Sequence, residues 1–160
     1  MKLIKIVIFL LITFNTSLKA NSNNDLQGIL KEGGKLIFIR HAYAPGRGDP
    51  DNFNIINCNT QRNLNKKGIE QSKSIGKILL KSNVEPYNAL SSEWCRCKQT
   101  AENAFKNYET KKFLNSFFSQ KFAINKSKQI KELKEYIQKW NGENNLIFVT
   151  HYVVIFELLN

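Results

Sequence analysis

Two histidines and two arginines stand where apolar segments end, and these residue types suit phosphoryl chemistry. Arg40 and His41 directly follow the apolar run 36–39. His151 follows the apolar run 146–149, with Thr150 in between. Arg96 stands near the start of a predicted helix. A neutral imidazole is a competent nucleophile with a pKa near working pH, and arginine offers a planar fork of donors that matches phosphate oxygens. These side chains predict a phosphoryl site if the fold brings them together.

The elements that must position these residues alternate between strands and helices. Apolar, β-rich runs predict buried strands at 35–40 and 145–150, with a shorter one at 88–91. Periodic apolar residues predict a helix capped by Asn65, with Ile69, Ile75, Ile78 and Leu79 facing inward, and further helices at 93–106, 127–140 and 153–159. Residues 42–62 are expected to form a long loop, 110–118 to hold an edge strand, and 117–121 to form a loop over the pocket.

Such alternation predicts an α/β fold of three layers (α/β/α) around a mostly parallel sheet. In sheets of this kind the binding crevice lies beyond the carboxyl ends of the strands. His41 and His151, the chain's two histidines, both follow predicted strands. We therefore expect them to project into one crevice.

The length, composition and charge of the chain limit the class of protein and the kind of partner. A chain of 160 residues with 42% hydrophobic content suits one globular domain, and excludes wholesale disorder and a polytopic membrane protein. The net charge of +11 favours an anionic partner. Most of these cations are lysines spread over predicted helix faces, and no basic-aromatic motif indicates nucleic acid. The oligomeric state is left open.

The N-terminus has the layout of a secretory signal. Lys2 and Lys5 precede the apolar core 6–14, which is too short for a comfortable membrane span, and small residues follow at Ala20 and Ser22. We expect residues 1–20 to be a signal peptide cleaved near 20–22, and 21–160 to be the mature domain, with no membrane span. Cleavage after Ala20 would lower the net charge from +11 to +8. An uncleaved N-terminal anchor is the alternative.

The three cysteines all lie in the part expected to be exported. In an oxidising compartment one pair can form a disulfide and leave one thiol. Cys95 and Cys97 are too close in sequence to pair well with each other, so we expect Cys58 to pair with one of them. A zinc site is not expected, since no histidine stands at metal-ligand spacing.

Four motifs, in order, resemble those of the histidine phosphatase superfamily, which has the phosphoglycerate-mutase-like fold. They are Leu-Ile-Phe-Ile-Arg-His-Ala at 36–42, Leu-Asn-Lys-Lys-Gly-Ile-Glu-Gln-Ser at 64–72, Ser-Ser-Glu-Trp-Cys-Arg-Cys-Lys-Gln-Thr-Ala at 91–101, and Phe-Val-Thr-His at 148–151. Together they span residues 35 to 151, which is nearly all of the mature chain.

The resemblance implies a role for each matching residue. His41 would be the nucleophile that forms a phosphohistidine, and Arg40, Arg96 and His151 would hold the phosphoryl oxygens. Arg47, in the loop after the nucleophile, is a candidate substrate contact. The family chemistry implies no cofactor and no metal.

The stretches 42–50, 58–64 and 94–97 look like those of one exported bacterial subgroup, which implies a periplasmic location. The expected function is therefore hydrolysis of a phosphomonoester or phosphoramidate on a small molecule. A phosphatase of cell-envelope glycolipid phosphates is an alternative, and mutase activity is not expected of so small an exported chain.

Two residues depart from the family pattern. Ala42 replaces a glycine, and the segment 110–131, where a loop acid is usual, contains no carboxylate. Asp49, Asp51 and Glu93 are the candidate proton donors. Because a missing acid slows departure of a poor leaving group, a catalytically weakened phosphate-binding protein is the second hypothesis.

Overall fold

The structure, a computed structural model, describes residues 6–9, 22–82, 84 and 89–160. Five strands form one sheet in the order β1-β2-β5-β3-β4, and every neighbouring pair is parallel. Their bounds are β1 (Ile6–Phe9), β2 (Leu36–Arg40), β3 (Ala89–Ser91), β4 (Glu109–Thr110) and β5 (Leu146–Thr150). The predicted parallel α/β sheet is confirmed, although the edge strand β4 begins one residue before the segment in which we expected it.

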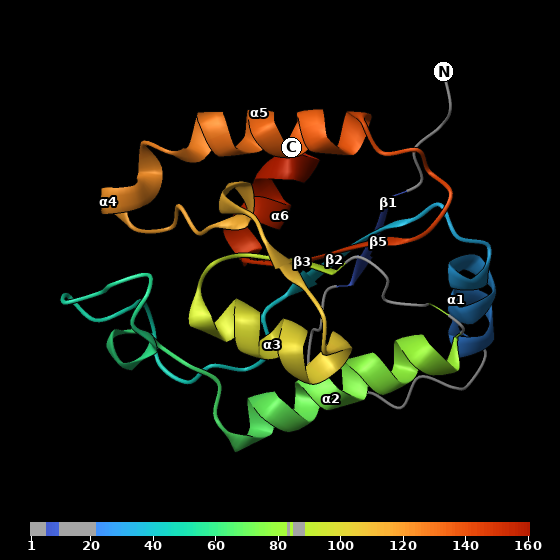
Figure 1. Ribbon diagram of the computed structural model, residues 1–160, viewed down its shortest axis with the longest axis horizontal. Coiled ribbons are helices and arrows are strands. Elements are labelled where there is room, and N and C mark those ends of the chain that lie inside the picture. Colours follow the sequence, from blue (N-terminus) through green and yellow to red (C-terminus); the bar gives the residue numbers. More distant parts are fainter. Residues whose placement is uncertain (1–5, 10–21, 83, 85–88) are drawn as a thin grey trace.

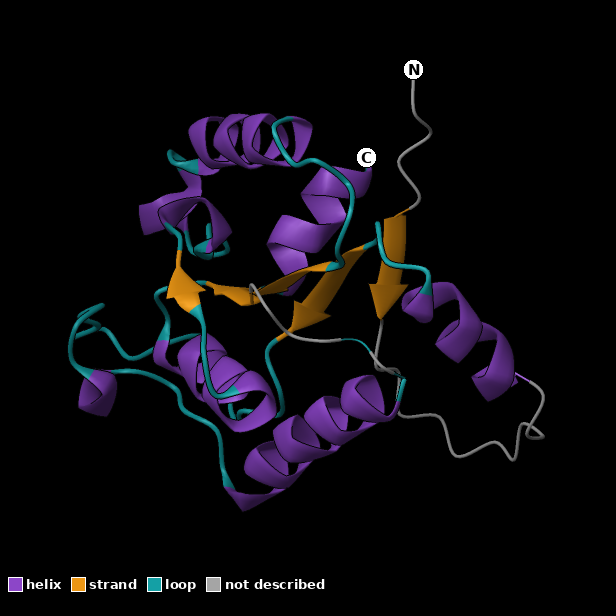
Figure 2. Ribbon diagram, turned by 45° about the vertical axis from the view of Figure 1, so that its right-hand side comes forward, coloured by secondary structure: helices purple, strands orange, loops and turns teal. Residues whose placement is uncertain are grey.

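Helices cover both faces of this sheet, as Figure 1 and Figure 2 show. On one face lie α1 (Ser22–Lys31), α2 (Lys66–Lys81) and α3 (Cys95–Phe105), and on the other lie α5 (Lys126–Gln138) and α6 (Tyr152–Leu159). The short helix α4 (Gln120–Ala123) precedes α5, and two 3₁₀ turns occupy Cys58–Thr60 and Lys112–Leu114. The three-layer arrangement is the one predicted.

The two central strands feed two hydrophobic cores because their side chains alternate between faces. In β2, Ile37 and Ile39 pack with the helices α1 to α3, whereas Leu36 and Phe38 pack with α5 and α6. Strand β5 divides its side chains in the same way, and its Phe148 stacks on Phe38 with ring centroids 4.5 Å apart. The observed register pairs Ile39 with Val149 and Arg40 with Thr150, so the two strands end side by side.

Two glycines bring α2 close to its neighbours. The N-cap Asn65 accepts a hydrogen bond from the backbone of Gly68, as predicted for a cap. A Cβ atom at Gly68 would collide with the backbone carbonyl of Tyr43, and one at Gly76 with the carbonyl of Ala104 in α3. The first contact places the loop after β2 against the start of α2, next to the strand ends that carry the candidate site.

Parts of the predicted local pattern are wrong. Ile78 of α2 is largely exposed, since the buried face of this helix consists of Gly68, Ser72, Gly76 and Leu79. Of the loop predicted over the pocket at 117–121, Phe118 and Ser119 are non-helical and line the cavity as expected, whereas Phe117 belongs to the core under α5 and α4 begins at Gln120. A four-residue helix leaves too little periodicity to be recognised in a sequence.

The segment 1–20, expected to be a signal peptide, is described only in part. Residues 6–9 form β1 beside β2, whereas residues 1–5 and 10–21 are outside the described residues. Of the two expected cleavage positions, Ala20 is therefore outside them, and Ser22 is the first residue of α1. Strands β2, β5, β3 and β4 are neighbours in that order, so they form a continuous sheet without β1. In the described part of the chain, no helix combines the length and the apolar character needed to cross a bilayer.

Candidate active site

The carboxyl ends of β2 and β5 and the start of α3 converge on one cavity of about 610 Å³. The backbone N–H of His41 donates to the carbonyl of Thr150 at 2.9 Å, which joins the two strand ends directly. The rings of His41 and His151 then meet edge to face, with centroids 5.5 Å apart. The prediction that both histidines share one crevice is confirmed.

The hydrogen bonding of His41 defines its tautomer. Its Nδ1 lies 2.8 Å from the carbonyl oxygen of Ala42. A carbonyl oxygen only accepts, so Nδ1 carries the hydrogen and Nε2 keeps its lone pair. Nε2 is therefore the ring nitrogen available as a nucleophile in the cavity.

Burial and positive charge keep both imidazoles neutral. Burial, followed by the charge of Arg96, lowers the pKa of His41 to about 3. The same two causes lower the pKa of His151 well below its usual value. Both rings therefore stay unprotonated across the neutral range, which preserves the nucleophilic lone pair of His41.

His151 is held by polar groups from the neighbouring strand end. Its Nε2 lies 3.0 Å from the hydroxyl of Ser92, and that hydroxyl donates to the side-chain oxygen of Asn115. Thr150, the preceding residue, donates its hydroxyl to the carbonyl of Leu114. These contacts fix the ring of His151 at the cavity wall.

Arg96 enters the cavity from the first turn of α3 and is almost completely buried. Its Nη1 donates to Asp49 at 2.7 Å, while its buried Nε has no hydrogen-bond partner among the described residues. An unsatisfied buried donor is costly. Arg96 also lines the cavity, so its positive charge and the N-terminus of α3 favour an anion bound there.

All four arginines of the chain line this cavity. Arg40 and Arg47 line the cavity and are exposed at its edge. Both are residues that the sequence predicts at the site. Arg62 is partly buried, and its Nη1 donates to the carbonyls of Ala44 and Gly46 at 2.7 and 3.1 Å. Sequence reasoning did not single out Arg62; the scarcity of arginine in a lysine-rich chain was the available signal.

The three candidate acids lie in different settings. Asp49 lines the cavity, and burial raises its pKa, but the N–H groups of Arg62 and Trp94 and the charge of Arg96 outweigh that effect and lower it overall. Asp51 lines the cavity edge and is exposed. Glu93 accepts a hydrogen bond from Asn115 and is not among the residues lining the cavity.

The cysteines support the site from one side. Cys58 and Cys95 form a disulfide that ties the loop after β2 to the first residue of α3, which confirms one of the two expected pairings. Cys97 is a buried free thiol whose pKa burial raises to about 12. No group of three or more His, Cys, Asp or Glu side chains suited to a metal ion occurs within the described ranges.

Several solved structures are similar to this one. A protein histidine phosphatase SixA in complex with tungstate matches with a TM-score of 0.58 and 17% identity, over 78% of this chain and 73% of that one. A proposed alpha-ribazole-5'-P phosphatase from Escherichia coli matches with a TM-score of 0.56 and 19% identity, over 78% of this chain and 77% of that one. A proposed phosphohistidine phosphatase SixA from Agrobacterium tumefaciens gives 0.56 and 19%, over 78% and 73%.

No family model and no curated protein sequence matches the chain. The structural similarity nevertheless extends over most of the chain and most of each relative. The chain therefore shares the fold of these phosphatase structures, a parallel sheet covered by helices on both faces.

Proposed function

We propose that this protein is an exported phosphatase that hydrolyses a phosphomonoester or phosphoramidate through a phosphohistidine on His41. The observation that carries the proposal is the free Nε2 of His41 in a cavity lined by every arginine of the chain. A neutral nucleophile beside four guanidinium groups suits a dianionic phosphoryl group better than any uncharged substrate.

The reaction proceeds in two displacements. Nε2 of His41 attacks phosphorus, the N–P bond forms, and the leaving group departs with the electron pair of the broken bond and then gains a proton. Water next attacks the phosphohistidine, the N–P bond breaks, inorganic phosphate leaves, and the lone pair returns to Nε2. The Nδ1–H bond to Ala42 holds the ring in the reactive tautomer throughout.

Charge on the transferring phosphoryl group is met by fixed donors. Arg96, Arg40 and Arg62 all line the cavity and supply positive charge there. His151 borders the phosphoryl position from β5. Because these donors are in place before the reaction, they stabilise the developing charge without reorganisation.

Export is supported by the N-terminal charge and apolar pattern and by the Cys58–Cys95 disulfide, a bond typical of oxidising compartments. We propose a periplasmic location, with a phosphorylated small molecule or an envelope phosphate as substrate. N-terminal sequencing of the protein recovered from a periplasmic fraction tests this, with a new terminus expected near residue 21 or 23.

The enzyme is tested with the purified mature protein and its His41→Ala variant. We expect turnover of soluble phosphomonoesters and an acid-labile labelled phosphohistidine in the wild type, and neither in the variant. Isolated envelope glycolipid phosphates form a second substrate arm. Arg96→Ala should weaken vanadate binding several-fold or more, since a charge-assisted hydrogen bond contributes about 1.5–3 kcal/mol.

The second candidate is a phosphate-binding protein of the same fold with weakened catalysis. It is favoured by one observation, namely that Asp49 is paired with Arg96 and therefore ionised, so it is a poor proton donor as it stands. Vanadate binding without turnover or trapped phosphohistidine in the wild type would establish this candidate in place of the enzyme.

A further inference from the structure

The cavity is much larger than a phosphoryl group requires. Its volume of about 610 Å³ falls within the range of small-molecule sites. The histidines and arginines occupy only part of its lining, and five of the other lining residues are aromatic: Phe53, Trp94, Phe118, Phe122 and Tyr152. The rest of the cavity must therefore receive whatever the phosphoryl group is attached to.

Three aromatic side chains form a continuous surface beside the phosphoryl site, which we call the aromatic wall: Phe53, Trp94 and Phe122. The rings of Phe53 and Trp94 are stacked with centroids 5.0 Å apart, and Phe122 meets both edge to face at 5.5 and 5.4 Å. Each of the three comes from a different part of the chain, and all of them line the cavity.

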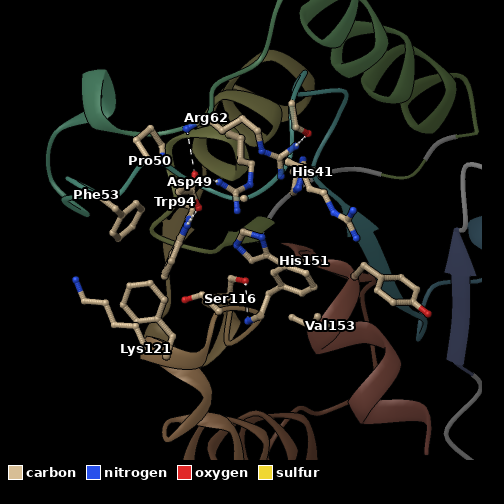
Figure 3. A pocket seen from close by; sticks show the side chains of 18 of the residues that line it. His41, Asp49, Pro50, Phe53, Arg62, Trp94, Ser116, Lys121, His151 and Val153 are labelled. Carbon is tan, nitrogen blue, oxygen red and sulfur yellow. Dashed lines mark hydrogen bonds and ion pairs between the residues drawn. The ribbon is translucent and has the colours of Figure 1, made fainter.

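The aromatic wall begins at the reactive centre. The ring of Trp94 lies 5.4 Å from that of His151, edge to face. Figure 3 shows Phe53 and Trp94 on one side of His151 and Val153 on the other. Phe118 also lines the cavity and is 66% exposed, so an apolar ring is left in water beside the wall. A group joined to the phosphoryl oxygen would thus lie directly against aromatic faces.

We infer that the substrate is an aryl phosphate, whose planar leaving group packs against the aromatic wall and Phe118. This inference rests on the proposed function and names the substrate class of the same site. A flat ring buries apolar area against these faces and gains the additional attraction of offset or edge-to-face aromatic pairs. A polyol or sugar would gain less from these ring faces, which offer its hydroxyl groups no hydrogen-bond partner.

The ion pair of Asp49 favours the same class. Asp49 is held ionised by Arg96 and Trp94, so it does not readily supply a proton to a departing oxygen. When the bond from phosphorus to an aryl oxygen breaks, its electron pair stays on a phenolic oxygen, which afterwards takes a proton from water. A phenol has a pKa of about 10, against about 15.7 for water, so an aryl oxide needs far less protonation than an alkoxide.

The test compares 1-naphthyl phosphate with phenyl phosphate, which differ by one fused ring and both release a phenolic leaving group. We expect kcat/KM of the wild type to favour the naphthyl ester about ten-fold. Phe122→Ala and Phe118→Ala should each reduce this preference about three-fold or more, and Phe118 is exposed enough for its variant to fold. Ile124→Ala is the matched control, since Ile124 directly follows α4, is 87% exposed and does not line the cavity.

The outcomes separate this inference from the proposed function. Vanadate inhibition should be unchanged in Phe122→Ala and Phe118→Ala, because vanadate occupies only the phosphoryl site. Turnover without a naphthyl preference, or a preference that survives both substitutions, overturns the aryl assignment alone. Absence of turnover with both esters, together with no trapped phosphohistidine, overturns the proposed enzyme as well.

Discussion

Nη1 of Arg96 donates to a carboxylate oxygen of Asp49 at 2.7 Å, and this buried ion pair joins the loop after β2 to the first turn of α3. The other carboxylate oxygen accepts the indole N–H of Trp94 at 3.0 Å. Asp49 thus fixes one residue of the phosphoryl site and one of the aromatic wall. It has the geometry of a positioning residue for both halves of the cavity.

Removing this carboxylate should destabilise the protein and increase its response to anions. Asp49→Ala leaves a guanidinium buried without its partner, and we expect a loss of about 2–4 kcal/mol in the free energy of unfolding. Added phosphate can replace the lost carboxylate, so it should raise the Tm of the variant by more than that of the wild type. Thermal unfolding with and without phosphate measures both effects.

Asp51→Ala is the control for that experiment, because Asp51 lies in the same loop and lines the same cavity but is exposed. Its unfolding free energy should change by no more than about 0.5 kcal/mol. Equal Tm values for the two variants would contradict the structural role of the ion pair.

The neutral histidines make stability depend on pH. Burial and the charge of Arg96 lower the pKa of folded His41 to about 3, below the ordinary value of about 6.5 expected in the unfolded chain. Between these values the unfolded state binds more protons, so stability falls as the pH drops below about 6.5. We expect His41 alone to contribute a loss on the order of 2–3 kcal/mol between pH 7 and pH 4.5.

Denaturant unfolding at several pH values measures this contribution. His41→Gln removes the titrating group and should flatten the dependence over that range, while His151 and Asp49 keep their own contributions. An identical pH dependence in wild type and variant would mean that His41 is readily protonated in the folded protein.

Arg62 should stabilise the loop after β2 as well as contribute positive charge to the cavity. Its two hydrogen bonds to the carbonyls of Ala44 and Gly46 hold the segment that carries Arg47 and Asp49. Arg62→Ala should therefore lower Tm and weaken vanadate binding about ten-fold. Arg47→Ala removes the same charge from an exposed position, and it should leave Tm unchanged and weaken binding only about two- to three-fold. Equal effects on Tm would show that Arg62 acts by charge alone.

The sequence predicted the part of the site that depends on regular structure. The apolar runs before Arg40 and His151 could become only buried parallel strands, and parallel strands end at the same edge of a sheet, so the convergence of the two histidines followed. The register observed between β2 and β5 pairs Arg40 with Thr150, next to His151.

The remainder depends on contacts that no local pattern records. Residues 42–62 lack strands and long helices, and side-chain contacts set their path. Gln61, for example, donates to the carbonyls of Asn54 and Ile55 and accepts a hydrogen bond from the backbone N–H of Cys95. Asp49 and Arg62 reach the cavity only through such contacts. Phe122 reaches it from a helix of four residues, which is too short to give a periodic signal.

The disulfide gives the last test of this loop. Cys58 and Cys95 are 37 residues apart and close the segment that contains Arg62, the whole of α2 and β3. Closing a segment of this length restricts the unfolded chain, and we expect its loss to cost roughly 2–4 kcal/mol. The double variant Cys58→Ser, Cys95→Ser should unfold at a correspondingly lower Tm than the oxidised wild type, and a reductant should not lower it further.

Cys97→Ala decides which thiol is the partner. Cys97 is buried and burial raises the pKa of its thiol to about 12, so it is a poor attacker in disulfide exchange. The Tm of Cys97→Ala should still fall on reduction, by as much as that of the wild type. If the reductant does not lower the Tm of this variant, Cys58 pairs with Cys97. The disulfide would then tie the loop after β2 to the third residue of α3 instead of the first, with Arg96 between the two positions.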